Sequence, residues 1–331
     1  MNKFLFVGFG LIGRQRLTAC LEYGIDHSDL YVYDPNISTP DIVSIVSLKQ
    51  ENILRDLSDV HLIGITHAIV AIPHNLAITH VIKLLDLGIR VLMEKPMGRN
   101  RTESEELHAH PNVKNLSVGF NYRFMPGVVQ LAESVHNNRL GKISNIKFEL
   151  GHGGSPNDGK SWKLDPNKAG GGVTLDPGIH LIDLLVFIFG ATTKNMSVAG
   201  VTSWSGFWET GIEESVNILG YVSEIPLSIS LSLVAWRTRF SLEVQGTESY
   251  FEVQGRGRTD GPQTVVQGNR WGWLNGSTQK ESEIFSMVAD KDKSIFAETV
   301  DWINNGTAVC SASQAFIGME IYDLIMKRMN E

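Results

Sequence analysis

The chain has 331 residues, 42% of them hydrophobic, and a formal net charge of −7. This length predicts roughly two domains of ~150 residues each. The acidic residues are dispersed and no basic run occurs, so nucleic acid is not an expected partner. Cys20 and Cys310 are too few for a disulfide framework or a structural zinc site. Such low cysteine use suits a reducing compartment, so we expect a cytoplasmic protein. No membrane partner is expected, since no apolar run reaches the ~18 residues of a membrane span.

Short apolar runs alternate with helical stretches in the first part of the chain. Strands are expected at 4–7, 30–33, 68–72, 91–93 and 116–118. Helices are expected between them, from a glycine turn to about residue 23, at 76–87 and at 103–108. Because strands that alternate with helices pair in parallel, residues 1–121 predict a doubly wound sheet of the Rossmann type.

The pattern changes in residues 122–331. A helix at 128–135 precedes alternating segments that predict one open, mostly antiparallel sheet, with strands at 143–150, 215–221, 225–234, 240–245 and 249–253. A helix is expected at 311–329, and the glycine-rich stretch 255–276 is expected to be a surface loop. The predicted fold class is therefore α/β, with two domains at 1–121 and 122–331.

The sequence GFGLIG lies directly after the first expected strand and opens a helix, and Asp34 ends the next strand. This spacing and context are those of a dinucleotide-binding turn. The helix N-terminus would hold the pyrophosphate, and the carboxylate of Asp34 would bind a ribose diol but repel a 2′-phosphate. NAD is therefore favoured, with NADP as the alternative. Cofactor contacts are expected from Gly8, Phe9, Gly10, Leu11, Ile12, Gly13 and Asp34.

Two further strand ends reach the edge of the sheet where ligands bind in doubly wound folds. The strand 68–72 ends at Ile72 and is followed by Pro73 and His74, and these three residues are further candidates for cofactor contact. The strand 91–93 leads into Glu94 and Lys95, which are likewise candidates for cofactor contact, and a lysine there could donate to a developing alkoxide. A Lys–Pro pair also ends strands for conformational reasons alone, and the cis or trans state of this bond is left open.

The segment 170–185 carries Asp176, His180 and Asp183 at spacings of four and three residues. On one helix these side chains would share a face, and a carboxylate beside a histidine can transfer a proton. Pro177 suggests that a new helix starts here with Asp176 as its N-cap. In that case Asp176 could be only a cap, His180 a core histidine and Asp183 an anchor or a ligand of substrate hydroxyls. No metal is expected, although these three residues with His152 form an alternative ligand set.

Four stretches extend these motifs: GFGLIG at 8–13, AIPHNLAITHVIKLLDLGIRVLMEKPM at 71–97, VGFNYRFMP at 118–126 and SWKLDPNKAGGGVTLDPGIHLIDLL at 161–185. Together they resemble the Gfo/Idh/MocA family of nicotinamide-dependent oxidoreductases. The resemblance implies a dinucleotide-binding domain followed by a domain for substrate binding and oligomerisation, in dimers or tetramers. It also implies Lys95, Asp176 and His180 as catalytic residues. Substrate contacts would come from Asn121, Arg123, Trp162, Lys163, Asp176, His180 and Asp183. Many relatives have a histidine where this chain has Ala77, so its role would be absent or would fall to His74 or His80.

The implied reaction is hydride exchange between a nicotinamide and a secondary alcohol or ketone of a sugar, polyol or sugar derivative. An NAD-dependent glycoside hydrolase and a non-catalytic NAD-binding regulator are the alternatives. The loops 151–160 and 203–211 are expected to contribute to specificity because they leave strands of the second domain. Several aromatic residues could stack on sugars, but most are expected to pack in the sheet or at an oligomer interface: Trp204, Phe207, Trp208, Trp236, Trp271 and Trp273.

Overall fold

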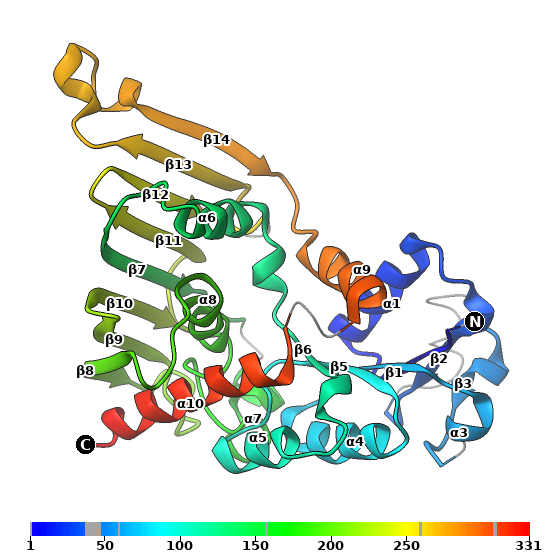
Figure 1. The fold of residues 1–331 in the computed structure, drawn as a ribbon. Coiled ribbons are helices and arrows are strands. Elements are labelled where there is room, and N and C mark those ends of the chain that lie inside the picture. The colour runs from blue at the N-terminus through cyan, green and yellow to red at the C-terminus, as the bar shows by residue number, and fades with distance from the viewer. Residues whose placement is uncertain (1, 37–47, 59, 156–157, 258–259, 307–309) are drawn as a thin grey trace. The chain divides into compact units, whose positions relative to one another are not determined.

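A computed structural model describes residues 2–36, 48–58, 60–155, 158–257, 260–306 and 310–331 (Figure 1). The chain divides into two compact units. The first contains Met1–Asn121 and Ile295–Phe316, and the second contains Tyr122–Ser294 and Ile317–Glu331. The chain first passes from one unit to the other between Asn121 and Tyr122. The segment 295–316, which was expected in the second domain, instead lies in the first unit because its helix packs against that unit's core.

The first unit is built on a parallel sheet with the strand order β3-β2-β1-β4-β5-β6. Its strands are β1 (Phe4–Val7), β2 (Leu30–Tyr33), β3 (Ile53–Leu54), β4 (His67–Val70), β5 (Arg90–Glu94) and β6 (Leu116–Gly119). The order reverses between β1 and β4. In open α/β sheets this reversal opens a crevice at the carboxyl ends of the strands, where ligands bind. The predicted parallel sheet is confirmed, with the two-residue strand β3 as an unpredicted addition.

Helices complete the first unit: α1 (Leu11–Tyr23), α3 (Val60–Ile63), α4 (His74–Asp86), α5 (Arg101–His108) and α9 (Ser294–Asn305). All four residues of β1 are buried, as expected for a central parallel strand covered on both faces. Trp302 of α9 packs with Phe4 and Leu17 in the hydrophobic core. The C-terminal segment therefore completes a core that begins at the N-terminus.

The second unit is built on a mixed, mostly antiparallel sheet with the order β14-β13-β12-β11-β7-β10-β9-β8. Its strands are β7 (Ile143–Gly151), β8 (Met196–Trp204), β9 (Ser215–Val222), β10 (Ile225–Ser232), β11 (Arg239–Gly246), β12 (Ser249–Gln254), β13 (Gln263–Asn269) and β14 (Glu283–Ala289). Among the described strand pairings of this second sheet, only β7–β10 is parallel. The predicted open sheet is confirmed, but the stretch expected as a surface loop contains β13.

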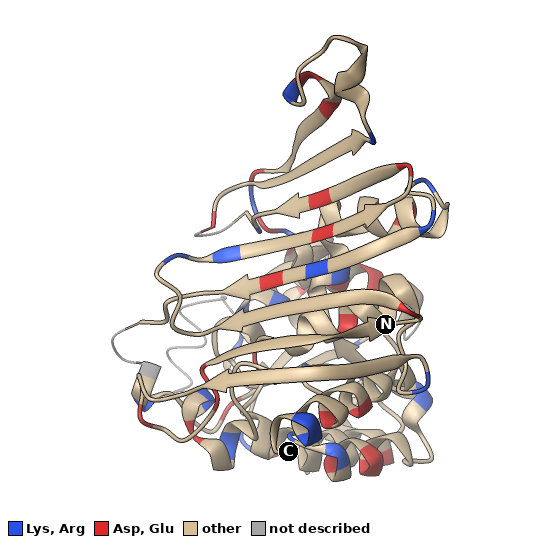
Figure 2. Cartoon of the chain, turned by 90° about the vertical axis from the view of Figure 1, so that its left-hand side faces the viewer, with Lys and Arg blue, Asp and Glu red and all other residues tan. Residues whose placement is uncertain are grey.

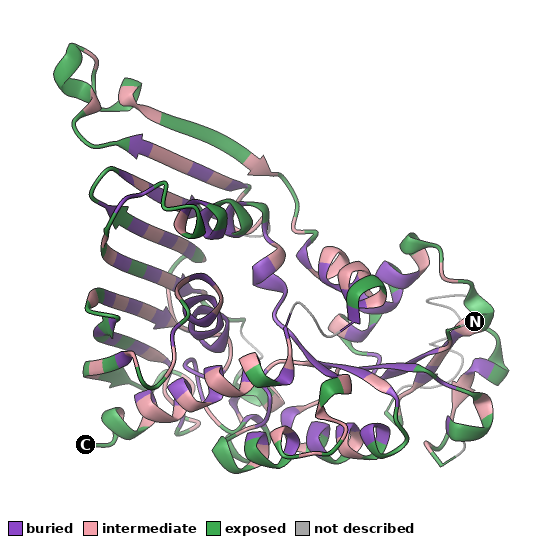
Figure 3. Ribbon diagram, viewed as in Figure 1, coloured by how far each residue is buried: buried purple, intermediate pink, exposed green. Residues whose placement is uncertain are grey.

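One face of this sheet is covered by helices and the other is open. The helices of the second unit are α6 (Pro126–His136), α7 (Pro166–Ala169) and α8 (Ile179–Phe189), and α10 (Ala312–Met329) belongs to it from Ile317 on. Helix α6 packs against β12, β13 and α8. Buried and accessible residues alternate along the central strands, as Figure 3 shows. The open face carries charges of both signs, including Lys147, Glu149 and Glu243 (Figure 2). In the described part of the chain, no helix has the length and apolar character needed to cross a membrane.

Candidate active site

The GFGLIG turn contains three glycines. Close packing requires glycine at positions 8 and 13, whereas position 10 faces open space. Gly8 has φ +94°, and a Cβ there would lie 2.4 Å from the carbonyl oxygen of Ala71. A Cβ on Gly13 would lie 2.1 Å from the carbonyl oxygen of Gly8, so helix α1 can approach the strand only with glycine here. A Cβ on Gly10 would meet no protein atom within 4 Å. This open side of the turn is where a pyrophosphate could approach the backbone.

Asp34 is held against this turn by two backbone donors. The N–H of Phe9 donates to its Oδ2 at 2.7 Å, and the N–H of Asn36 donates to its Oδ1 at 2.9 Å. Helix α1 begins after Gly10 with no side-chain cap and no acidic residue in its first turn. An uncapped helix start with a fixed carboxylate nearby fits the pyrophosphate and ribose of a dinucleotide. The residues present therefore fit NAD.

The remaining residues of the turn divide between core and surface. Phe9 is fully buried, so only its backbone is available to a ligand, whereas Leu11 is exposed. Ile12 lies in the first turn of α1, and Ile72 lies against Gly8.

The strand end after β4 continues directly into helix α4. Pro73 is the N-cap of α4, and His74 is its buried first residue. His80 lies on the exposed side of the same helix, where its Nδ1 is 2.8 Å from the carbonyl oxygen of Leu76. Of the two histidines considered as substitutes at Ala77, His74 therefore lies at the carboxyl end of the sheet.

Lys95 directly follows β5, so it lies at the carboxyl end of the parallel sheet, and the Lys95–Pro96 peptide bond is cis. The preceding residue, Glu94, has a structural partner. Its Oε1 accepts from Nε of Arg16 at 3.0 Å and from Nη2 of Arg16 at 2.8 Å. This ion pair was not expected from the sequence, which had assigned Glu94 to cofactor contact.

The segment that carries Asp176 departs from the predicted helical stripe. The Asp176–Pro177 bond is cis, and α8 begins at Ile179 with Gly178 as its N-cap. The prediction that Asp176 caps this helix is therefore wrong. Asp176 lies in the turn before the helix, where its N–H donates to the carbonyl oxygen of Gly172 at 2.9 Å. Only His180 and Asp183 of the predicted stripe lie on the helix.

Asp176 and His180 each have a defined neighbour in the second unit. The Nζ of Lys163 lies 3.0 Å from Oδ2 of Asp176, and the same ammonium lies 6.0 Å from the ring centre of Trp162. The ring of His180 stacks on that of Tyr122, with 3.9 Å between the ring centres and 6° between the planes. The pairing of Lys163 with Asp176 brings together two residues that the sequence had named separately.

Asp183 and Arg123 form a buried ion pair. Their side chains are each 1% exposed, and the guanidinium donates to both carboxylate oxygens, at 2.8 and 2.6 Å. Burial raises the pKa of Asp183, while Arg123 opposes this shift. Substrate contact had been expected for both residues, but each polar group is turned to the other. Asn121, the last residue of the first unit in this part of the chain, is also buried.

Three residues that the sequence did not single out organise the surroundings of Asp176 and His180 within the second unit. Tyr122 supports the His180 ring, and its hydroxyl is 2.6 Å from Nη1 of Arg256. The carboxylate of Glu213 accepts from the backbone N–H of Gly172 at 3.1 Å and thereby holds the turn before Asp176. Tyr122 could have been suspected because it lies between Asn121 and Arg123. The roles of Glu213 and Arg256 could not be recognised from the sequence, because the residues that they contact are distant along the chain.

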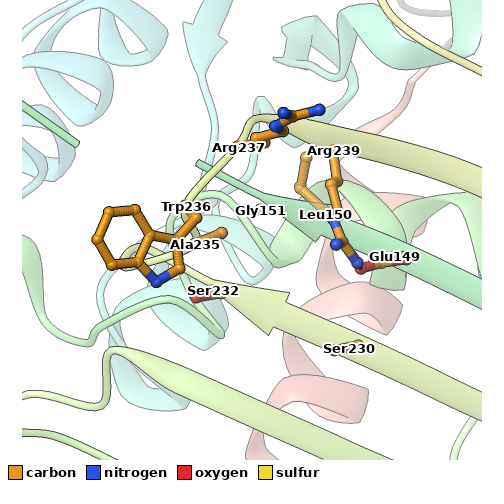
Figure 4. Close-up of a pocket in the computed structure, with 9 residues that line it drawn as sticks. All are labelled: Glu149, Leu150, Gly151, Ser230, Ser232, Ala235, Trp236, Arg237 and Arg239. Atoms are coloured by element: carbon orange, nitrogen blue, oxygen red, sulfur yellow. The ribbon is translucent and has the colours of Figure 1, made fainter. Parts of the chain in front are cut away.

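The aromatic residues considered for sugar stacking are largely accessible. Trp204, Phe207, Trp236, Trp271 and Trp273 are all exposed. Trp236 borders a cavity of about 310 Å³ on the second unit (Figure 4), lined by Glu149, Leu150, Gly151, Ser230, Ser232, Ala235, Trp236, Arg237 and Arg239. Glu214 orders the loop 203–211, since its carboxylate accepts from the N–H of Phe207 and of Trp208, both at 2.8 Å. The loop 151–160 lies partly outside the described residues, at 156–157.

The alternative metal site has no support in the described ranges, where no group of three or more His, Cys, Asp or Glu side chains could hold a metal ion. The Nδ1 of His152 instead accepts from the backbone N–H of Gly154 at 3.1 Å.

The similar curated proteins include dehydrogenases that are named for sugar substrates. Levoglucosan dehydrogenase of Pseudarthrobacter phenanthrenivorans is 27% identical over 139 residues, which are 41% of this chain and 34% of that protein. Glucose-6-phosphate 3-dehydrogenase of Bacillus subtilis is 32% identical over 198 residues, which are 57% of this chain and 54% of that protein. The match thus spans between a third and about half of the length of these relatives.

Solved structures match over nearly the whole chain at low identity, which supports the fold. A complex of levoglucosan dehydrogenase with NADH and levoglucosan has a TM-score of 0.82 and 18% identity, and the match covers 100% of this chain and 98% of that one. An inositol dehydrogenase homologue from Azotobacter vinelandii in complex with NAD+ has a TM-score of 0.78 and 15% identity, with 99% and 95% covered.

Two family models match consecutive parts of the chain. One describes an oxidoreductase family with an NAD-binding Rossmann fold and matches residues 2–122. The other describes the Gfo/Idh/MocA C-terminal domain and matches residues 128–252. The division between the two models falls where the chain leaves the first compact unit. The chain therefore belongs to the Gfo/Idh/MocA family of NAD-binding oxidoreductases.

Proposed function

We propose that this protein is an NAD-dependent dehydrogenase that acts on a secondary alcohol of a sugar, polyol or sugar derivative, or reduces the corresponding ketone. The observation that carries the proposal is the GFGLIG turn, with an open side at Gly10 and the carboxylate of Asp34 fixed to the N–H of Phe9. Curated relatives that act on levoglucosan and glucose 6-phosphate support the substrate class.

The proposed cofactor contacts come from the first unit. The backbone of the glycine turn and the start of α1 would hold the pyrophosphate, and Asp34 would hold a ribose diol. This arrangement favours NAD over NADP, since a 2′-phosphate would be repelled by the carboxylate. Bound NAD supplies the hydride acceptor, and the chain's own residues handle the proton.

His180 is the proposed general base for oxidation and the general acid for reduction. Its ring is fixed in orientation by the stack on Tyr122. Asp176 would stabilise the protonated imidazole, and Lys163 would hold that carboxylate in place through their ion pair. Lys95 would donate to the substrate oxygen as negative charge develops on it. Arg123 and Asp183 would act by fixing the His180 helix rather than by touching substrate.

A screen of sugars, inositols and nucleotide sugars with NAD, read by NADH absorbance, tests this proposal. We expect turnover of at least one of these compounds and its loss in Lys95→Ala. Cleavage of p-nitrophenyl glycosides with NAD present would indicate the glycoside hydrolase instead. Tight NADH binding with no turnover of any compound would indicate the regulator.

We further propose a homodimer or homotetramer that assembles through the open face of the second unit's sheet, and a cytoplasmic location. The assembly is supported by exposed apolar side chains on that unit, among them Leu219, Tyr221, Phe285 and Met287. Large exposed apolar areas commonly mark protein interfaces. The location is supported by the low cysteine use, since a chain of 331 residues carries only Cys20 and Cys310.

A further inference from the structure

A fully buried arginine lies beneath the carboxyl ends of β5 and β6 in the first unit. Arg16 is 0% exposed, and all five of its N–H donors have acceptors. Nε and Nη2 donate to Glu94, and Nη2 also donates to Glu298. Nη1 donates to Oγ1 of Thr299 at 3.0 Å and to the carbonyl oxygen of Ile295 at 3.3 Å. One guanidinium thus joins α1, β5 and α9.

The same cluster contacts the end of β6. Glu298 accepts a hydrogen bond from the backbone N–H of Phe120, which follows β6 and precedes Asn121. A Cβ on Gly119 would lie 2.8 Å from Nη2 of Arg16, so a larger residue there would displace the guanidinium. Glu94 is bonded directly to Lys95 along the chain. The cluster therefore fixes the two strand ends from which Lys95 and Asn121 project.

We propose that Arg16 and Glu298 are positioning residues that hold the end of β5, and with it Lys95, in the geometry needed for catalysis. This inference rests on the proposed function, in which Lys95 donates to the substrate oxygen. Neither residue lies in a stretch that suggested a catalytic role, since Glu298 comes from the C-terminal segment and lies 282 residues from Arg16.

Stability alone is a weak reason for this arrangement. Two carboxylates share one guanidinium out of water, and buried ion pairs of this kind are often no more stabilising than apolar residues of similar volume. Burial raises the pKa of Glu298 to about 7, Arg16 opposes the rise, and Glu94 adds to it. The charged groups that face Glu298 are thus Arg16 of α1 and Glu94 of β5. We therefore expect the contacts that fix the end of β5 to change near neutral pH, where Glu298 gains or loses its proton.

Glu298→Ala and Glu298→Gln test this role, with Trp302→Phe as the matched control. Trp302 lies on the same helix and is similarly buried, but it packs against Phe4 and takes part in none of the cluster's hydrogen bonds given above. We expect Glu298→Ala to lower kcat by about ten- to a hundredfold with KM for NAD near the wild-type value, because small misplacements of catalytic groups have effects of this size. Glu298→Gln keeps an oxygen acceptor, so it should retain most of kcat and lose the pH dependence near neutrality.

A second readout does not depend on turnover. Acetylation of Lys95 by acetic anhydride is measured by peptide mass spectrometry across pH, with the exposed Lys114 as internal reference. We expect the rate and its pH profile to change severalfold in Glu298→Ala and to stay at wild-type values in Trp302→Phe. Unchanged kcat and an unchanged Lys95 profile in Glu298→Ala would overturn the proposal. If the wild-type protein turns over no substrate, the proposed function fails, while the Lys95 profile still decides whether Glu298 positions this lysine.

Discussion

His180 is held by its surroundings on two sides: by the start of helix α8 and by the parallel stack on Tyr122. Tyr122 is itself fixed through its hydroxyl by Arg256, whose Nε is 3.0 Å from Oδ2 of Asp260. An imidazole held in this way loses little further freedom when a substrate binds. This is the condition under which a proton-transferring group is effective.

Replacing His180 with asparagine should remove the proton acceptor while keeping a polar side chain. We expect turnover to fall by about 10² to 10⁴, the usual contribution of a positioned acid–base group. NADH affinity, measured by fluorescence titration, should stay near the wild-type value. The control is His136→Asn, at a histidine whose Nε2 lies 3.1 Å from the carbonyl oxygen of Ile188 in the same unit. Near wild-type turnover in His180→Asn would refute the assignment.

Asp34 is expected to determine the choice between NAD and NADP. Asp34→Asn retains an acceptor for the N–H of Phe9 but removes the charge that repels a 2′-phosphate. NAD binding should weaken, and the ratio of the Kd values for NADP and NAD should fall, as measured by calorimetry. Asp26→Asn, at an exposed carboxylate that caps the turn before β2, serves as control. The ribose assignment would be untenable if Asp34→Asn kept the wild-type ratio.

The ion pair of Arg123 with Asp183 should be important for stability. Asp183→Asn would leave the guanidinium buried without its countercharge, and we expect the free energy of unfolding to fall by about 3–5 kcal/mol. Urea denaturation followed by tryptophan fluorescence measures this loss. The double change Arg123→Met with Asp183→Leu should recover most of it, because no charge is then buried. Equal stability of Asp183→Asn and wild type would contradict the structural role.

The bounds of helices and strands with a clear periodicity of apolar residues were predicted closely from the sequence. The bounds of β1 and β2 agree with the expected strands, and α10 lies within one residue of the expected helix. The prediction that Asp176 shares a helix with His180 and Asp183 was wrong, because α8 begins three residues after Asp176. Strand β14 was missed because four successive residues, Ile284–Met287, are all exposed, which gives no alternation. Strand β13 was not predicted because the glycine-rich stretch that contains it was interpreted as a surface loop.

Long-range partners in the site could not be predicted from sequence. GFGLIG and Asp34 were recognised because turn geometry fixes their spacing within one βαβ unit. The pairing of Arg123 with Asp183 spans 60 residues, and its geometry depends on how α8 packs in the second unit. Arg16 was overlooked because an arginine on a helix next to a glycine turn is ordinarily exposed.

Strand β4 begins with a histidine that should make the first unit sensitive to acid. His67 is buried between the rings of Phe4 and Trp302, and burial, followed by repulsion from Arg90, lowers its pKa from 6.5 to about 4. A lowered histidine pKa means that the folded state favours the neutral ring. Its contribution to stability is therefore present above pH 6.5 and is lost as the pH falls toward 4.

The variant His67→Phe should reduce this acid sensitivity. Between pH 7 and pH 4 we expect it to lose on the order of 2 kcal/mol less of its unfolding free energy than wild type. Urea titrations at each pH measure the difference. A parallel decline in both proteins would show that His67 does not titrate on unfolding.

At the scale of the whole molecule, the open face of the second unit's sheet leads us to expect a homo-oligomer in solution. Leu219 and Tyr221 project from β9 on the side away from the helices, and both are exposed. Replacing both with glutamate should dissociate the assembly because like charges would meet across a symmetric interface. Light scattering after gel filtration should then report about 36.6 kDa, the mass of one chain. Leu87→Glu, at an exposed position of the first unit, is the control. A wild-type protein that already elutes as a monomer would exclude the proposed assembly.

The return of residues 295–316 to the first unit also affects how the protein folds while it is being synthesised. The guanidinium of Arg16 needs Glu298, which leaves the ribosome 282 residues later. At translation rates of ~5–20 residues per second, the nascent N-terminal sheet waits on the order of half a minute for this partner. Throughout that time the surface that later receives Trp302 is uncovered, while residues Tyr122–Ser294 of the second unit emerge. The N-terminal unit is thus the first to begin folding and among the last to finish.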